Sequence, residues 1–304
     1  MKDIINNFME WNMKMNKAEK TIKMYNDYIV NFVDEYQITI ENINQLEDKE
    51  FAKRFIDDEL AKGFAPGTIN KHKNIISTFS NYLVFEDIIE SNKFKEMSNI
   101  KNDNHKIETY STDEVESILN LVNEKCNREY QRHIDKQVAV MYKAIFNIFT
   151  KLALRNEEVT RIEINDIDWN TGMMYVRCKG HKEEISHKSK MNKETLEIVK
   201  EWLSIRETIK VKDENKNLLF ISPLNKKGVS TDAIRKQMKN IKEELGIEND
   251  LLIHSMRHTR ISQLISKGAD IKKVSQFAHH TSQNTTEKFY CHSTDEMLDE
   301  LSEL

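Results

Sequence analysis

Residues 254–290 read HSMRHTRISQLISKGADIKKVSQFAHHTSQNTTEKFY, and their pattern predicts two consecutive helices. The first begins at His254 and ends where a lysine and Gly268 form a helix stop signal. A second helix is predicted to begin near Asp270. Its buried side is formed by Ile271, Val274 and Phe277. A short polar loop then leads to Tyr290, which is close enough in sequence to reach the same pocket.

The same stretch concentrates side chains that suit attack on a phosphodiester. His254 and Arg257 stand three residues apart and share one helix face, while His279, His280 and Tyr290 follow. Each residue alone has an ordinary explanation, because single helical histidines and arginines usually face solvent and a tyrosine usually packs at a core edge. An anion clamp, imidazoles and a hydroxyl nucleophile are hard to explain as independent packing choices. Together they predict an active site.

Length and composition bound the class of protein. A chain of 304 residues is long enough for two domains of ordinary size. The N-terminus has no apolar signal-peptide segment, and no run of 18 apolar residues predicts a membrane span. The three cysteines are too scattered for a disulfide framework, so a reducing cytoplasm is expected. Cys291 and His292 lack the spacing of a structural zinc site, and no metal is expected.

The charge balance argues mildly against a nucleic-acid partner, because the net charge is −4 and the isoelectric point is about 6.2. Residues 1–100 hold 13 basic and 17 acidic side chains, and the remainder of the chain holds 33 of each. DNA binding would therefore need one basic face on each domain, with the acidic side chains turned away.

Residues 1–98 predict a small helical bundle. Thr68 follows a clear turn and is a predicted cap for the fourth helix of this bundle. Lys71 and Lys73 lie off the apolar stripe of that helix and are candidate contacts to a DNA backbone. A solvated face is the ordinary explanation for such a lysine pair. The sequence then turns polar and loses its periodicity, so residues 99–110 are predicted to be an interdomain linker.

Residues 111–304 predict a second domain that is mainly helical and carries a small antiparallel sheet. Ser111 opens a capping box at its first helix. Arg155 follows an apolar stretch and needs an anion partner, which is either Glu158 or a bound phosphate. Lys179 lies at the tip of a predicted β-hairpin. A tip lysine is usually solvated, yet a hairpin folded over a cleft would deliver its ammonium to a substrate.

Short motifs along nearly the whole chain resemble those of the tyrosine recombinase, or phage integrase, family. In the second domain they are LRNEEV at 154–159, CKGHK at 178–182, HSMRHT at 254–259, FAHHTS at 277–282 and TTEKFYCH at 285–292. They look like the family's first arginine motif, lysine hairpin, His-x-x-Arg helix, Leu-Gly-His-x-Ser box and tyrosine segment. In the first domain, KTIKMY at 20–25 and PGTIN at 66–70 resemble the family's helical core-binding domain. The resemblance implies a SAM-like core-binding domain followed by a catalytic domain.

Three positions depart from the family pattern. His279 stands where a glycine is usual, and Ala153 replaces another glycine. The Asn-Pro pair that often ends the first domain is replaced by SNK at 91–93. A histidine in place of the glycine at position 279 would alter the local geometry of the loop before the nucleophile. It does not argue against the resemblance to the family.

The resemblance implies cleavage and exchange of DNA strands through a covalent 3′-phosphotyrosyl bond. Tyr290 would be the nucleophile, Arg155 and Arg257 would clamp the phosphate, and His254 would act as a general base or hydrogen-bonding partner. Three further residues would have supporting roles. His280 would donate a hydrogen bond to the phosphate, and Lys179 would protonate the departing 5′ oxygen. Glu158 would orient neighbouring groups. No cofactor is implied, because a phosphate-cradling glycine motif is missing and the phosphotyrosyl link conserves bond energy.

Strand exchange between two duplexes implies a homotetramer on double-stranded DNA with a specific recombination site. The acidic, amphipathic tail at 294–304 is the expected contact between protomers. The reaction would integrate, excise or resolve a mobile element, with Xer-like resolution of chromosome or plasmid dimers as an alternative. A type IB topoisomerase shares the chemistry, but the helical first domain and the Tyr-x-His segment favour a recombinase. A catalytically inactive DNA-binding regulator is the alternative from another class, and retention of all six catalytic candidates argues against it.

Overall fold

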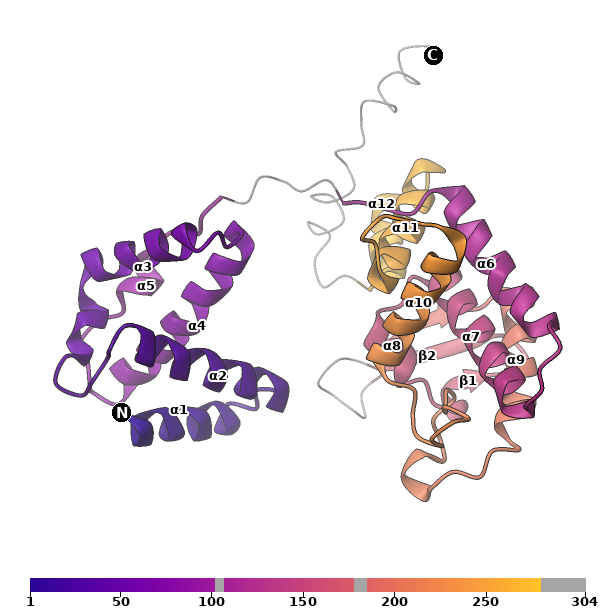
Figure 1. The fold of residues 1–304 in the computed structure, drawn as a ribbon, viewed down its shortest axis with the longest axis horizontal. Coiled ribbons are helices and arrows are strands. Elements are labelled where there is room, and N and C mark those ends of the chain that lie inside the picture. The colour runs from indigo at the N-terminus through magenta and orange to yellow at the C-terminus, as the bar shows by residue number, and fades with distance from the viewer. Residues whose placement is uncertain (102–106, 178–184, 280–304) are drawn as a thin grey trace, which may run out of the picture. The chain divides into compact units, whose positions relative to one another are not determined.

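The computed structural model describes residues 1–101, 107–177 and 185–279. The chain divides into two compact units, Met1–His105 and Lys106–Leu304 (Figure 1). The division falls within the stretch that was predicted to be a linker.

The first unit is a helical bundle around an aromatic core. Its elements are α1 (Lys2–Lys14), α2 (Glu19–Glu35), η1 (Ile43–Glu47), α3 (Lys49–Ala61), α4 (Pro66–Phe85) and α5 (Lys93–Glu96). The core rings are those of Phe8, Phe32, Phe55, Phe79 and Phe94, each at most 2% exposed. The predicted cap at Thr68 is wrong, because α4 already begins at Pro66. The fixed φ of proline suits the first turn of a helix, and Thr68 lies within that turn.

Lys73 requires a second correction. It is 4% exposed, and its ammonium donates hydrogen bonds to the Met97 carbonyl (2.8 Å) and to Asn99 Oδ1 (2.7 Å). Burial lowers the pKa of Lys73 below its ordinary value. The expectation that Lys73 lies on a solvated, DNA-facing surface is therefore wrong, because this lysine ties α4 to the segment after α5. Lys71 is exposed, and its contact with DNA stays a prediction.

Alanine substitutions at Lys73 and Lys71 should separate a structural lysine from a surface lysine. Lys73→Ala removes the donor for two acceptors, so we expect the free energy of unfolding to fall by about 1–3 kcal/mol. Lys71→Ala should change it by less than about 0.5 kcal/mol, because exposed side chains contribute little to stability. Chemical denaturation of the full-length variants measures both effects. Equal stability of the two variants would contradict the contacts of Lys73.

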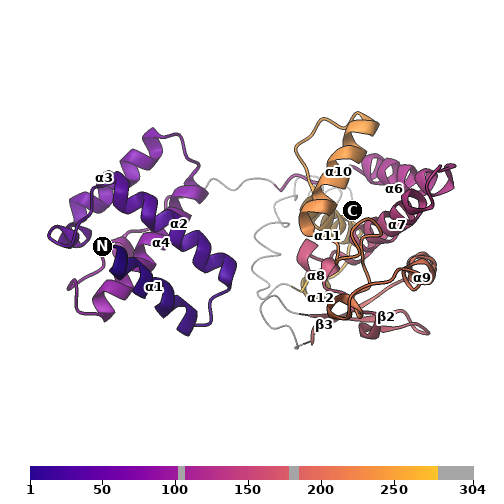
Figure 2. The ribbon, with the colours of Figure 1, turned by 60° about the horizontal axis from the view of Figure 1, so that its bottom comes forward.

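The second unit is mainly helical and contains a small antiparallel sheet, which confirms the predicted fold class. Its helices are α6 (Thr112–Asn127), α7 (His133–Leu152), α8 (Asn156–Thr160), η2 (Ile164–Asp166), α9 (Lys193–Arg206), η3 (Asp213–Asn215), α10 (Thr231–Leu245), α11 (Ile253–Ser266) and α12 (Ile271–Phe277). The strands β1 (Ile167–Asp168), β2 (Met173–Arg177) and β3 (Ile185–Lys190) lie in the order β1-β2-β3. Figure 2 shows β2 and β3 along one side of this unit, with α6 and α7 on the other side. Within the described part of the chain, no helix is both long and apolar enough to cross a membrane.

Local signals set the helix boundaries in this unit. Ser111 forms the predicted capping box at α6: its hydroxyl accepts a hydrogen bond from the Glu114 amide (3.1 Å), and its own amide donates to the Glu114 carboxylate (2.8 Å). Gly172 adopts a φ of 73° in the turn between β1 and β2, where a side chain would be strained. The capping box therefore fixes the start of α6, and Gly172 allows the turn that joins β1 to β2.

Two apolar clusters hold the second unit together. The larger one surrounds α7 and includes Phe146, Phe149 and Trp202, each at most 1% exposed. The smaller cluster holds the end of α7 against α11 and α12. Its buried members are Ala153, Ile261, Ile265, Val274 and Ala278. The candidate catalytic side chains meet beside this smaller cluster.

The two ends of the predicted linker 99–110 form hydrogen bonds with different units. The Asn70 side chain exchanges two hydrogen bonds with the backbone of Ile100 (2.8 and 2.9 Å) in the first unit. Tyr110 is 3% exposed, and its hydroxyl donates to the Leu251 carbonyl (2.5 Å) in the second unit. Residues 100 and 110 therefore belong to the units that they contact.

Candidate active site

Arg155 is positioned by a sharp turn at the end of α7. That helix ends at Leu152, and Ala153 turns the chain in a left-handed conformation with a φ of 51°. Arg155 Nη1 donates to Glu158 Oε1 (2.7 Å), and the Arg155 amide donates to Glu158 Oε2 (2.7 Å). Arg155 Nη2 donates to the His279 carbonyl (3.0 Å). Glu158 therefore orients the guanidinium, while 37% of the Arg155 side chain stays open to solvent.

Arg257 reaches the same place from α11. It is 2% exposed, its Nη1 donates to the Ala153 carbonyl (2.5 Å), and its Nη2 donates to the Ala278 carbonyl. The carbonyls of Ala278 and His279 are adjacent, so both arginines contact one short segment although they lie far apart in sequence. Carbonyl oxygens carry no net charge, so these bonds position Arg257 without cancelling its charge. Two guanidinium groups arranged in this way suit an anion with several oxygens, such as a phosphate.

His254 lies on α11, one turn before Arg257. Its ring contacts that of His258 edge-on, with 4.8 Å between the ring centroids. Part of the His254 side chain is exposed, yet desolvation by neighbouring atoms lowers its pKa below 6.5. The positive charges of Arg257 and Arg155 lower this pKa further, while Glu158 opposes them. His254 is therefore a neutral imidazole near pH 7, and a neutral imidazole can accept a proton.

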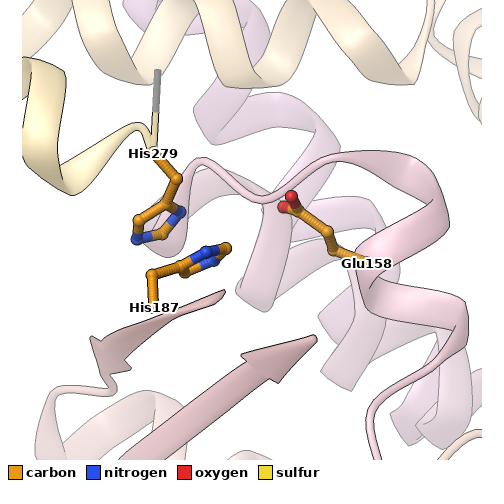
Figure 3. A group of neighbouring side chains, drawn as sticks. All are labelled: Glu158, His187 and His279. Atoms are coloured by element: carbon orange, nitrogen blue, oxygen red, sulfur yellow. The ribbon is translucent and has the colours of Figure 1, made fainter. Parts of the chain in front are cut away.

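Two further histidines complete the described site: His187 was not a predicted site residue, and His279 belonged to the predicted group without an assigned role. His187 on β3 and His279 after α12 stack their rings on one another (Figure 3). Burial lowers the pKa of His187 to about 4, with further lowering by Arg155 and Arg257. Burial also lowers the pKa of His279 to about 3, with contributions from His187 and both arginines. Side chains alternate between the two faces of a strand, so His187 lies on the same face of β3 as the buried Ser189. This alternation was the sequence signal that could have predicted the position of His187.

The structure brings some of the predicted site residues together and does not describe others. Arg155, Glu158, His254 and Arg257 converge from α8, α11 and the turn before α8. Lys179, His280 and Tyr290 lie outside the described residues, so their catalytic roles stay predictions. His279 adopts a φ of 54°, so it occupies a left-handed conformation at the position where the family usually has a glycine.

Comparison with known proteins supports the family resemblance. The sequence profile of the phage integrase family matches residues 108–297. The tyrosine recombinase XerC of Thermodesulfovibrio yellowstonii is 24% identical over 293 residues, which cover 95% of this chain and 91% of that protein. XerC of Bacillus subtilis is also 24% identical, with 97% of this chain and 94% of that protein covered.

Solved recombinase structures share the fold. The XerH site-specific recombinase bound to a palindromic difH substrate matches with a TM-score of 0.74 and 20% identity, covering 95% of this chain and 81% of that chain. The Tn1549 transposon integrase bound to a circular intermediate DNA matches with a TM-score of 0.73 and 16% identity, covering 98% and 99%. The family profile covers more than half of the sequence, and the chain therefore belongs to the phage integrase family.

Proposed function

We propose that this chain is a tyrosine-type site-specific DNA recombinase, which cleaves and rejoins DNA strands through a covalent 3′-phosphotyrosyl intermediate. One observation carries the proposal: Arg155 and Arg257 meet at the adjacent carbonyls of His279 and Ala278. That segment leads directly into His280, the predicted phosphate donor. Membership of the phage integrase family supports the same reaction.

In the proposed reaction, both guanidinium groups bind the non-bridging oxygens of one phosphodiester and stabilise the charge that develops there. A tyrosine hydroxyl has a pKa of about 10, so Tyr290 needs a neighbouring base, and His254 supplies a neutral imidazole. Tyr290 Oη forms a bond to phosphorus as the bond to the 5′ oxygen breaks. Lys179 protonates the departing oxygen, and His280 donates a hydrogen bond to the phosphate. The 5′ hydroxyl of a partner strand then reverses these steps without a nucleotide or metal cofactor.

A nicked DNA substrate tests cleavage directly. When the short strand beyond the cleavage point diffuses away, religation fails and the protein stays covalently attached to the 3′ phosphate. We expect a protein–DNA adduct on a denaturing gel, with substrates drawn from the DNA that flanks the gene. A catalytically inactive DNA-binding regulator would instead shift the DNA on a native gel and give no adduct. The same assay therefore decides between the two classes of function.

The lowered pKa of His254 predicts how cleavage responds to pH. The neutral imidazole is the competent form, and desolvation together with Arg257 and Arg155 disfavours the protonated form. We expect the single-turnover rate to decline as the pH falls, with a midpoint below pH 6.5, because the pKa of His254 is lowered from that value. His254→Asn should lower the rate by about 100-fold or more and abolish this decline. A decline centred above pH 6.5 that persists in the variant would contradict the role of His254.

We infer that four copies assemble on two DNA duplexes, because exchange of both strands needs four active sites. The tail at 294–304 contains Met297, Leu298 and Leu301 among acidic residues, which suits docking on a neighbouring copy. A pocket of about 190 Å³ between α7 and α10 supports such docking. Its lining includes the apolar residues Val138, Met141, Tyr142, Leu224 and Ala233, with Lys236 beside them. The apolar walls suit the tail's apolar side chains, and Lys236 suits its acids.

Removal of the tail tests this assembly. We expect a chain that ends at residue 293 to bind a single site but to form at least about 10-fold less tetramer on DNA, measured by multi-angle light scattering. Leu224→Asp should give the same defect, because it places a charge at the rim of the pocket. Asp232→Ala changes an exposed residue of α10 outside the pocket lining and is the matched control. Full tetramer formation by the shortened chain would exclude the tail as the contact.

Two biological roles fit this chemistry. The similar proteins include Xer recombinases and a transposon integrase. We propose that the chain integrates, excises or resolves a mobile element in the cytoplasm, with Xer-like dimer resolution as the second candidate. A plasmid that carries two copies of the site tests exchange itself. Sites found at the ends of a mobile element would support the first role, and one site near the replication terminus would support the second.

A further inference from the structure

Three side chains with metal-binding chemistry converge beside Arg155. They are Glu158 from α8, His187 from β3 and His279 after α12, and one ligand atom of each lies within 4.8 Å of the others. Figure 3 shows the carboxylate of Glu158 pointing towards the two stacked imidazole rings. The three residues come from separate elements, so the fold and not a single sequence motif assembles the group.

The donor atoms are suited to a metal ion. Each Glu158 oxygen accepts one N–H from Arg155, which leaves a second lone pair on each oxygen. His279 Nδ1 is buried and has no hydrogen-bond partner among the residues that the structure describes. An imidazole binds metal in its neutral form, through the lone pair of the ring nitrogen that carries no proton.

We propose that Glu158, His187 and His279 bind one divalent transition-metal ion such as Zn²⁺, with water in the fourth position. Two imidazoles and one carboxylate form a common ligand set for zinc, whereas Mg²⁺ and Ca²⁺ prefer oxygen ligands alone. Ligands about 2.1 Å from a tetrahedral ion stand about 3.4 Å apart. The three atoms are within 4.8 Å, so rotation of the side chains is enough to close the site.

The occupied site would inhibit DNA cleavage, and this step rests on the proposed recombinase function. Metal binding draws Glu158 away from the guanidinium of Arg155, which it holds at 2.7 Å. Arg155 Nη1 thereby loses the carboxylate that orients it towards the phosphate, although the His279 carbonyl still accepts from Nη2 (3.0 Å). The positive charges of Arg155 and Arg257 oppose the cation, so we expect micromolar and not nanomolar affinity.

Titration of the metal-free, full-length chain with Zn²⁺ by calorimetry tests binding without DNA. We expect one ion per chain, and at least about 10-fold weaker binding in His279→Gly. Glycine suits the φ of 54° at this position, so this variant removes a ligand without adding backbone strain. His133→Ala changes an exposed histidine at the start of α7 and should bind Zn²⁺ normally. Cys291→Ser should also bind normally. Undiminished binding in His279→Gly would overturn the site.

Cleavage of the nicked substrate tests the inhibition separately. Zn²⁺ at ten times the measured Kd should lower the wild-type rate at least about 5-fold, and excess EDTA should restore it. His279→Gly should lose this sensitivity relative to its own metal-free rate. Zn²⁺ binding by a protein that forms no adduct even in EDTA would refute the recombinase function and leave the metal site standing. Full cleavage by a Zn²⁺-saturated wild-type protein would overturn the inhibitory role.

Discussion

Tyr290→Phe should abolish the covalent protein–DNA adduct, with cleavage reduced by at least about 1,000-fold, while DNA affinity stays within about 2-fold of wild type. Phenylalanine keeps the aromatic ring and lacks the hydroxyl that forms the bond to phosphorus. Affinity should persist because phosphate contacts from basic side chains and backbone amides dominate binding to DNA. A denaturing gel measures the adduct on a nicked substrate, and a native gel measures the affinity.

A second tyrosine provides the control for this substitution. Tyr175 on β2 is partly buried, and the Lys188 ammonium lies 5.3 Å from its ring centroid, a contact that phenylalanine retains. Tyr175→Phe should therefore cleave at the wild-type rate. Adduct formation at the wild-type yield in Tyr290→Phe would assign the nucleophile to another residue. Loss of DNA affinity in that variant would show that the hydroxyl acts in binding as well.

The elements of the fold follow from local patterns in the sequence. The capping box at Ser111 involves residues one helical turn apart, and it was predicted. The small antiparallel sheet was also predicted, and its strands β1 and β2 are joined by a turn that contains Gly172. Such signals are readable because the interacting residues are neighbours in sequence. The convergence of Arg155 and Arg257 could be inferred only through the family resemblance.

The contacts that sequence reasoning missed join residues that are distant in sequence. Lys73 lies off its helix's apolar stripe, yet the chain after α5 returns to cover it and supplies two acceptors. Helix periodicity shows which residues share a face of one helix, but it does not show which distant segment covers that face. His187 and His279 meet because β3 and the end of α12 are brought together by the fold. Their low pKa values also depend on that burial, so no local pattern predicts them.

Ala153 and His279, which stand where the family usually has glycines, share the same backbone conformation. Ala153 and His279 adopt φ angles of 51° and 54°, a conformation that costs a non-glycine residue about 1 kcal/mol or more. Such strain persists only where surrounding contacts hold the backbone in place. Arg257 binds the carbonyls of Ala153 and Ala278, and Arg155 binds that of His279. The two arginines therefore also stabilise these two turns.

Arg257→Lys should consequently lower both stability and cleavage. The guanidinium of Arg257 donates to the Ala153 and Ala278 carbonyls from two separate nitrogens. A lysine has a shorter side chain with a single nitrogen, so it would donate to only one of these carbonyls. We expect the free energy of unfolding to fall by about 2–4 kcal/mol, because a buried carbonyl loses its donor and the strained turns lose support. Cleavage, measured at a temperature where the variant is folded, should fall by at least about 100-fold, because the phosphate loses bidentate binding.

Arg161→Lys is the matched control for this substitution, because Arg161 is exposed and its Nη2 lies 3.9 Å from Glu157 Oε2. It should change the free energy of unfolding by less than about 0.5 kcal/mol and leave cleavage unchanged. A stability defect in Arg257→Lys with wild-type cleavage would restrict Arg257 to holding the turns. A cleavage defect at wild-type stability would mean that the carbonyl bonds contribute nothing to the fold. Only the combined loss is consistent with one buried guanidinium that both builds the site and binds the phosphate.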